Sequence, residues 1–339
     1  MKLRALGEFG LIEQIRQKVV DPASVYRGIG DDAAELSLPD GHRLLTSTDM
    51  LIEGVHFRFE WTDSHSLGRK AVAVNLSDLA AMGGTPSFLY LSLACPVDVD
   101  FTEVEAFFEG ALAEMATFQV TLVGGDTCRS PGPWVISVTV EGHVSPGDSV
   151  GRLQARPGDV ILVSGTLGDS ALALNHLKSH LPVDPYLLQR HLRPLPRIAL
   201  GQALGAQHLA SAMIDISDGL SADLGHLLMP AGLDALLDAA QIPLSSAFRD
   251  VVRDQPDFFE LALHGGEDYE LLFTATPENV PAVMALSDSL NVPVSAIGKL
   301  EKGSGQIKLR QTTGRIDPVL ARGYDHFGPS QKTPEGRNA

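Results

Sequence analysis

Short β-type runs alternate with helical stretches over almost the whole chain, and this alternation restricts the fold to a mixed α/β architecture. In the first half, helix 102–118 is predicted to begin at Thr102 as its N-cap, with Glu105 completing a capping box. The other predicted elements of this half are strands at 44–47, 88–94, 120–123 and 134–140, and a helix at 67–82 that Gly83 and Gly84 end.

A segment rich in Gly, Pro and charge, residues 145–159, interrupts this series and is typical of a domain linker. A second series follows, with strands at 160–164, 213–216, 269–274 and 294–297, and helices at 170–177, at 220–228 and from near Pro277. We therefore expect one domain over residues 1–147, a second over 148–327, and a disordered polar tail over 328–339.

Composition excludes several classes of function. The chain has 339 residues, 44% hydrophobic and 20% charged, which is typical of a globular protein. A net charge of −16 argues against nucleic-acid binding, because phosphate backbones require a basic surface. No apolar run reaches the roughly 18 residues of a membrane helix, and the N-terminus does not resemble a secretion signal. Two cysteines provide no disulfide framework, so we expect a cytoplasmic protein.

Aspartates recur directly after apolar strand-like runs or beside small residues. Carboxylates in such positions are good ligands for hard cations, and Ser47 and Thr48 add hydroxyl oxygens beside one of them. A single aspartate in this setting is most often a turn or helix cap, but the repetition favours magnesium binding. The candidates are Asp32 in GIGDDAA, Asp49 in LLTSTDM, Asp126 in LVGGDT, Asp215 and Asp218 in MIDISDG, and Asp78 on the helix AVNLSDLAAMGG.

Two glycine-containing segments could bind anions. Gly124 and Gly125, just before Asp126, allow a phosphate to approach the backbone closely. The segment GTLGDS at 165–170 follows a strand and begins a helix, although a plain strand-to-helix turn explains it equally well. The sequence contains no GxxxxGK[ST], no GxGxxG after a strand and no GxSxG, so P-loop, Rossmann and α/β-hydrolase sites are not indicated.

Taken together, these motifs resemble those of the thiamine-monophosphate kinases, within the aminoimidazole ribonucleotide synthetase superfamily. The similar segments extend from GEFGLI at Gly7 to GYDHF ending at Phe327. The aspartate motifs are shared by the superfamily, whereas EGVHF at 53–57 and GGEDYELLF at 265–273 are more particular to the kinases. The other matching segments are GDDAA, TSTDML, GRKAVAVNLSDLAAMGG, VGGDT, SGTLGDS and DISDGL.

The resemblance implies a two-domain PurM-like fold of mixed α/β sheets, with the N-terminal domains of a homodimer forming a central β-barrel and an α/β domain at the C-terminus. It implies several Mg²⁺ ions, with ATP as co-substrate and thiamine monophosphate as acceptor. By resemblance, the metal ligands are Asp32, Ser47, Thr48, Asp49, Asp78, Asp126, Asp215 and Asp218. ATP would contact Phe108, Gly125, Asp126, Arg152 and Ser217, thiamine monophosphate would contact His56, Glu267 and Tyr324, and Asp126 and Asp218 would be catalytic.

The chain departs from the family at Phe108, where a tyrosine is frequent, and at Tyr324, where a tryptophan stacks on the substrate. Two other functions stay open at this point. One is a different ATP-dependent enzyme of the superfamily, such as aminoimidazole ribonucleotide synthetase. The other is a non-enzymatic acidic metal-binding module, which would explain the aspartates but not Gly125, Arg152 and Glu267 together.

Overall fold

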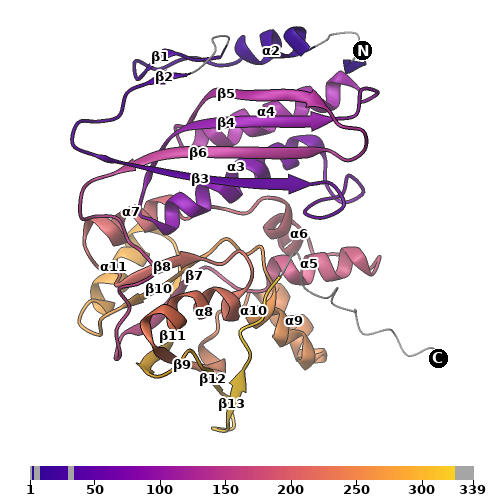
Figure 1. Ribbon diagram of the computed structural model, residues 1–339. Helices are drawn as coiled ribbons and strands as arrows, with labels where there is room; N and C mark the ends of the chain where they lie inside the picture. The colour runs from indigo at the N-terminus through magenta and orange to yellow at the C-terminus, as the bar shows by residue number, and fades with distance from the viewer. Residues whose placement is uncertain (1, 4–7, 30–33, 325–339) are drawn as a thin grey trace, which may run out of the picture.

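The computed structural model describes residues 2–3, 8–29 and 34–324, and Figure 1 shows two sheets, one above the other. The upper sheet has four strands in the order β3-β6-β4-β5. Helix α2 (Glu8–Arg16) and a small sheet of β1 (Val25–Arg27) and β2 (Glu35–Leu36) lie beside it. The four strands are β3 (Arg43–Ile52), β4 (Thr85–Cys95), β5 (Thr121–Arg129) and β6 (Val135–Val144).

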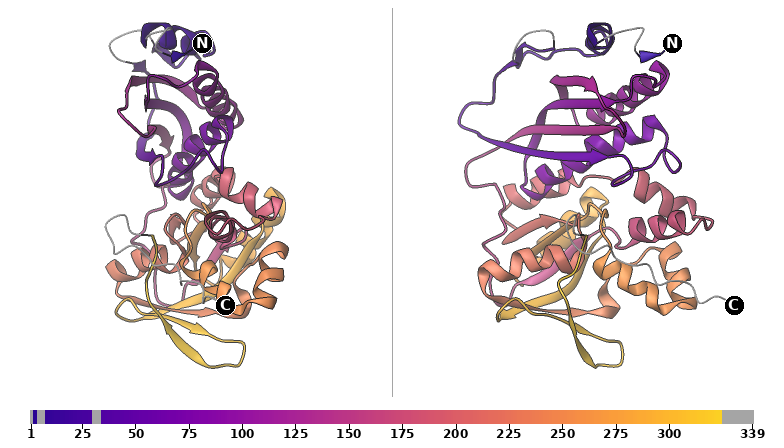
Figure 2. Two further views of the ribbon diagram at one scale, coloured as in Figure 1. Left: turned by 90° about the vertical axis from the view of Figure 1, so that its right-hand side faces the viewer. Right: turned by 45° about the vertical axis from the view of Figure 1, so that its right-hand side comes forward.

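Helices α3 (Ser64–Ala81) and α4 (Phe101–Thr117) cover one face of this sheet, as the left view of Figure 2 shows. They pack closely because small residues face each other: a Cβ on Gly68 of α3 would collide with the carbonyl oxygen of Phe107 in α4. The predicted capping of α4 is wrong. The helix begins after Asp100, and Glu105 instead pairs with Lys18, at 3.1 Å.

The lower sheet has seven strands in the order β13-β12-β9-β11-β7-β10-β8. Its strands are β7 (Val160–Ser164), β8 (Ala212–Asp215), β9 (Leu233–Asp238), β10 (Leu271–Ala275), β11 (Val294–Lys302), β12 (Ile307–Arg310) and β13 (Ile316–Val319). The helices around it are α5 (Asp169–Lys178), α6 (Pro185–Leu192), α7 (Ile198–Ala206), α8 (Leu220–Ala231), α9 (Ser246–Asp254), α10 (Glu260–His264) and α11 (Val280–Leu290), with short 3₁₀ turns η1 (Ala239–Gln241) and η2 (Pro256–Phe259).

The predicted strands in both halves all fall in these sheets, and residues 145–159 contain neither helix nor strand. Strand β10 begins two residues later than predicted, because Tyr269 has a left-handed backbone with φ of 51°. The mixed α/β, two-domain architecture is therefore confirmed. The boundary at residue 147 remains a prediction, and the predicted tail at 328–339 lies outside the described residues.

Helix α3 joins the two halves. It is buried on nearly all sides and contacts β3 on one side and both β8 and α7 on the other. One hydrophobic core accordingly runs from the upper sheet into the lower half, where Leu200 and Phe273 belong to it. A second core fills the rest of the lower half. The described strands of the upper sheet form an open layer rather than a closed barrel, with β3 and β5 at its edges.

Candidate active site between the two sheets

Strand β3 and helix α3 face each other with polar side chains. Strand alternation turns Ser47 and Asp49 toward α3. The Ser47 Oγ donates to Asp78 Oδ2 at 2.5 Å, and the Asp49 amide donates to Asn75 Oδ1 at 3.1 Å. Thr48 points to the opposite face, where its Oγ1 donates to the Val138 carbonyl at 3.0 Å. Ser47 and Asp49 of β3 and Asp78 of α3 therefore lie between the strand and the helix, whereas the Thr48 side chain points away from them.

The lower half adds aspartates from the end of β8 and the turn after it. Asp215 accepts a hydrogen bond from Ser77 Oγ of α3 at 2.7 Å, which ties the two halves together at this point. Asp218 lies in the turn before α8, where its amide donates to Asp223 Oδ2 at 3.1 Å. We call Asp49, Asp78, Asp215 and Asp218 the acidic cluster.

The carboxylates of the acidic cluster are close enough to perturb one another. Burial, together with the charges of Asp78 and Asp218, raises the pKa of Asp49 to about 6. Burial and the Asp78 carboxylate raise the pKa of Asp215 to about 8. Burial also raises the pKa of Asp78, against the opposing effects of Ser47 and Arg152. These groups are therefore costly to ionise together unless a cation offsets their charge.

The donor atoms suit magnesium, which prefers carboxylate and hydroxyl oxygens and keeps several waters. Within the part of the chain that the structure describes, no three His, Cys, Asp or Glu side chains are grouped closely enough to hold a metal ion by themselves. Such a set is compatible with ions that take one or two carboxylates each and complete their shells with water and substrate phosphate. Asp32 lies outside the described residues.

Gly125 and Asp126 lie on the other edge of the upper sheet. The pairing across the sheet runs from Asp49 to Val138 to Leu91 to Gly125, three strand spacings apart, which is about 14 Å. Gly125 is required where it stands, because a Cβ there would collide with the Leu91 carbonyl oxygen. Asp126 is exposed, and a single chain does not bring it to the acidic cluster.

The remaining predicted nucleotide contacts are placed differently. Arg152 is exposed and lies close enough to Asp78 to affect its charge. Ser217 adjoins the cluster, and its carbonyl accepts from the Glu267 amide at 2.8 Å. Phe108 is only 3% exposed and packs edge-on against Phe107 inside the core. Arg152 and Ser217 thus join the site, and Phe108 does not.

The predicted acceptor contacts lie on both sides of the cleft between the halves. Glu267 has a left-handed backbone with φ of 67°, pairs with Lys70 of α3 at 2.8 Å, and has a carboxylate oxygen 3.3 Å from Nδ1 of His191 on α6. Burial opposes the charge, but Lys70, His191 and His56 outweigh it and lower the pKa of Glu267. Glu267 is thus a persistent carboxylate held by residues of both halves.

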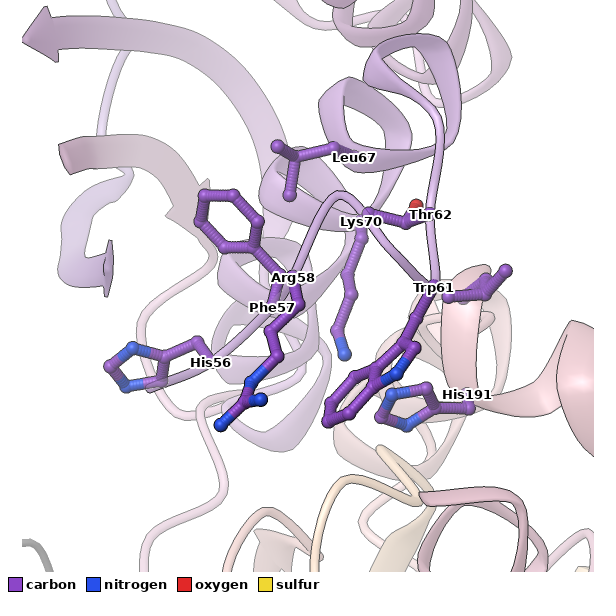
Figure 3. A pocket seen from close by; sticks show the side chains of 9 residues that line it. His56, Phe57, Arg58, Trp61, Thr62, Leu67, Lys70 and His191 are labelled. Atoms are coloured by element: carbon purple, nitrogen blue, oxygen red, sulfur yellow. The ribbon is translucent and has the colours of Figure 1, made fainter. Parts of the chain in front are cut away.

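A small, partly open pocket lies beside this ion pair, and His56, Arg58, Trp61, Lys70 and His191 are among its lining residues (Figure 3). The His56 Nδ1 accepts from the Ile52 amide at 3.0 Å, which fixes the ring at the end of β3. His56 and Glu267 are therefore brought together. Tyr324 donates its amide to the Asp218 carbonyl at 3.1 Å, and its side chain is 51% exposed beside the acidic cluster.

A second group of carboxylates includes Glu270, three residues after Glu267, and this group forms ion pairs with arginines. Glu270 is fully buried and receives Arg197 through two hydrogen bonds of 2.6 Å each and Arg190 at 2.9 Å. Asp169 and Asp268 are buried beside Arg190. We call these five residues the arginine-paired cluster.

Several residues of the site were not found by sequence reasoning. Tyr269 lies close to several carboxylates of the site. Burial, together with the charges of Glu267, Asp49, Asp215 and Asp78, raises the pKa of its phenol well above the usual value. Lys70 and His191 escaped notice because a lysine in an apolar helix and a histidine in an unpredicted one carry no motif. Their only signal was the hydrophobic setting of Lys70 in GRKAVAV, which demands a buried partner.

Both halves match known family models: residues 30–144 match the N-terminal domain of AIR synthase related proteins, and residues 156–309 match the C-terminal domain. The class is thus an AIR synthase related protein. Hydrogenase maturation protein HypE has the same fold, with a TM-score of 0.79 at 20% identity over 94% of this chain and 97% of that one.

Closer relatives narrow the family. The thiamine-monophosphate kinase of Haemophilus influenzae is 40% identical over 96% of this chain and 100% of its own length, and that of Salmonella typhimurium is 42% identical over 95% and 99%. The kinase structure from Stenotrophomonas maltophilia superposes with a TM-score of 0.80 at 39% identity, over 90% of this chain and 96% of that one. The chain belongs to the thiamine-monophosphate kinase family.

A further solved structure, described as AaThiL complexed with AMPPCP and TMP, superposes with a TM-score of 0.75 at 36% identity, over 96% of this chain and 99% of that one. Among the helices within the described residues, none is both long and apolar enough to cross a bilayer.

Proposed function

We propose that the chain transfers the γ-phosphate of ATP directly to thiamine monophosphate, with several Mg²⁺ ions, to form thiamine diphosphate. The observation that carries this proposal is the acidic cluster, in which β3, α3 and β8 bring carboxylates of both halves together beside His56 and Glu267. The relative described as bound to AMPPCP and TMP supports the same pair of ligands.

Charge explains why the site is acidic. Two unit charges about 4 Å apart repel by about 4 kcal/mol at an effective dielectric of about 20, and both reacting phosphates carry more than one charge. Bound Mg²⁺ would offset this repulsion as the phosphates approach. Asp49, Asp78, Asp215 and Asp218, with Ser47, would hold these ions, and Asp32 and Asp126 would complete the set. Arg152 would clamp the nucleotide phosphates.

The chain's own residues need not remove a proton from the acceptor. A phosphate monoester has a second pKa of about 6, so its oxygen is largely ionised at neutral pH. Transfer then depends on positioning and electrostatics, without a phosphoenzyme. Inversion of configuration at a chiral γ-phosphate is expected, and retention would contradict direct transfer.

A homodimer would explain why Asp126 lies on the far edge of its own sheet. Edge strands β3 and β5 are exposed at Thr46, Thr48 and Met50 and at Gly125, Asp126 and Cys128. Pairing β3 of one subunit with β5 of the other, at both seams of a two-fold dimer, would close an eight-stranded barrel. That pairing would place one subunit's Asp126 near the other's Asp49.

Mixing two inactive variants tests this arrangement. Asp49→Asn and Asp126→Asn should each abolish turnover, whereas their mixture should recover roughly a quarter of wild-type activity, since half the dimers would carry one intact site. No recovery after subunit exchange, which mass spectrometry would verify, would place both aspartates in a site within one chain.

The test of function is a phosphate-transfer assay with radiolabelled ATP and thiamine monophosphate, with and without Mg²⁺. Magnesium-dependent formation of thiamine diphosphate is the expected result. Turnover of the substrate of aminoimidazole ribonucleotide synthetase instead would favour that enzyme's reaction. Cation binding without nucleotide binding, measured by calorimetry, would favour the non-enzymatic module. The cytoplasmic location remains a prediction.

A further inference from the structure

The loop before α3 presents a large aromatic side chain at the mouth of the pocket. Phe57 is buried, and Phe59 packs edge-on against Trp134 at 5.2 Å, so alternate residues of this loop are anchored in the upper core. A turn, in which the Trp61 amide donates to the Arg58 carbonyl at 2.9 Å, then directs Arg58 and Trp61 outward. The Trp61 indole is only partly buried, and the anchored residues Phe57 and Phe59 fix its position.

The face of the Trp61 indole already receives a planar cation. The guanidinium carbon of Arg58 lies 5.0 Å from the ring centroid, within the range of a cation–π contact. Arg58 is exposed, so another cation can take its place at little cost. Among side chains, indole is the strongest partner for such a contact.

Lys70 and His191 also line this pocket, and neither leaves an uncompensated positive charge in it. Lys70 lines the pocket and pairs with Glu267 at 2.8 Å, and His191 lines it from the lower half (Figure 3). Burial and the Lys70 charge lower the pKa of His191 to about 4, so this imidazole is neutral and does not repel a cation. Since Glu267 offsets the Lys70 charge, the indole face that Arg58 covers is the part of this pocket that can receive a cationic heterocycle.

We infer that Trp61 is a substrate-binding residue, and that its indole packs against the cationic ring of the phosphate acceptor in the position Arg58 now occupies. This inference rests on the proposed function, because the thiazolium of thiamine monophosphate is the planar cation concerned. It assigns to Trp61 a stacking contact in addition to the one expected of Tyr324, and it places the ring between the Glu267 side of the cleft and the loop before α3.

Fluorescence provides a readout that does not depend on turnover. The chain has two tryptophans, and Trp134 is only 3% exposed in the upper core. Thiamine monophosphate should therefore quench the emission of the Trp134→Phe variant and leave that of Trp61→Phe nearly unchanged. Inorganic phosphate should quench neither, because it has no ring. If Trp134→Phe folds poorly, the difference between wild type and Trp61→Phe gives the same information.

Kinetics supply the second arm. Trp61→Ala should raise the KM for thiamine monophosphate about tenfold, with the KM for ATP and kcat little changed, because the contact would be equal in the ground and transition states. Trp61→Phe should fall in between. Glu60→Gln, an exposed change on the same loop, should have no effect.

An unchanged KM in Trp61→Ala, or no quenching of Trp134→Phe at saturating thiamine monophosphate, would overturn the inference about Trp61. If the wild-type protein still turned over thiamine monophosphate normally, the proposed function would stand. A wild-type protein that neither binds nor phosphorylates thiamine monophosphate would overturn both.

Discussion

The acidic cluster and Glu270 of the arginine-paired cluster deal with buried carboxylates in opposite ways. Glu270 is neutralised by Arg190 and Arg197 within the protein itself. Asp49, Asp78 and Asp215 mainly face one another, so their pKa values rise. Glu270 is therefore neutralised without a ligand, whereas the acidic cluster is stable as carboxylates only when cations from solution join it.

Asp78→Asn should separate function from stability most strongly. Loss of a central carboxylate should reduce turnover by about 1,000-fold or more. The metal-free protein should be as stable as wild type or more so, because burial raises the Asp78 pKa and a neutral amide relieves that cost. Initial rates and thermal melts in a chelator measure both effects. Asp288→Asn, an exposed change on α11, is the control, and near-normal turnover in Asp78→Asn would contradict the metal model.

Glu270→Gln, in contrast to Asp78→Asn, should lower the stability of the protein. Removing this carboxylate takes from Arg197 the acidic group that it contacts and leaves Arg190 with Asp169 at 3.8 Å, which should lower the free energy of unfolding by about 3–5 kcal/mol. Urea denaturation measures the change. Glu301→Gln breaks an exposed pair with Lys299 and should cost no more than about 0.5 kcal/mol. Equal effects of the two changes would remove the contrast between the clusters.

The stabilising effect of Mg²⁺ should grow with pH. Burial and neighbouring carboxylates raise the pKa of Asp49 to about 6 and of Asp215 to about 8. For a carboxylate with a raised native pKa, the stabilisation is full below the unfolded pKa and is lost as pH rises through the native value. Magnesium replaces these protons, so its increment in Tm should be larger at about pH 8 than at about pH 6, by about 2–4 °C. A pH-independent increment would argue that other groups bind the ion.

Sequence patterns predicted the alternating architecture, the break at 145–159 and strands at 44–47, 120–123 and 213–216. Asp49 and Asp126 were expected just after the first two strands, but β3 and β5 are longer and contain them. They could not predict that Asp126 would lie across the sheet from Asp49, because strand order depends on packing between distant segments. Helices α6 and α7 were missed, since both are short and lie in a segment interrupted by prolines. His191, which is on α6, was lost with that helix.

Calorimetry of Mg²⁺ binding, at neutral pH in two buffers of different ionisation enthalpy, tests most directly whether the acidic cluster binds the cations that offset its charge. Carboxylates with raised pKa values must lose protons to take the ion. The apparent binding enthalpy should therefore depend on the buffer and report net proton release, and Asp78→Asn should reduce that release. Binding with no proton release, or the same release in Asp78→Asn, would contradict the assignment of these aspartates as the cation site.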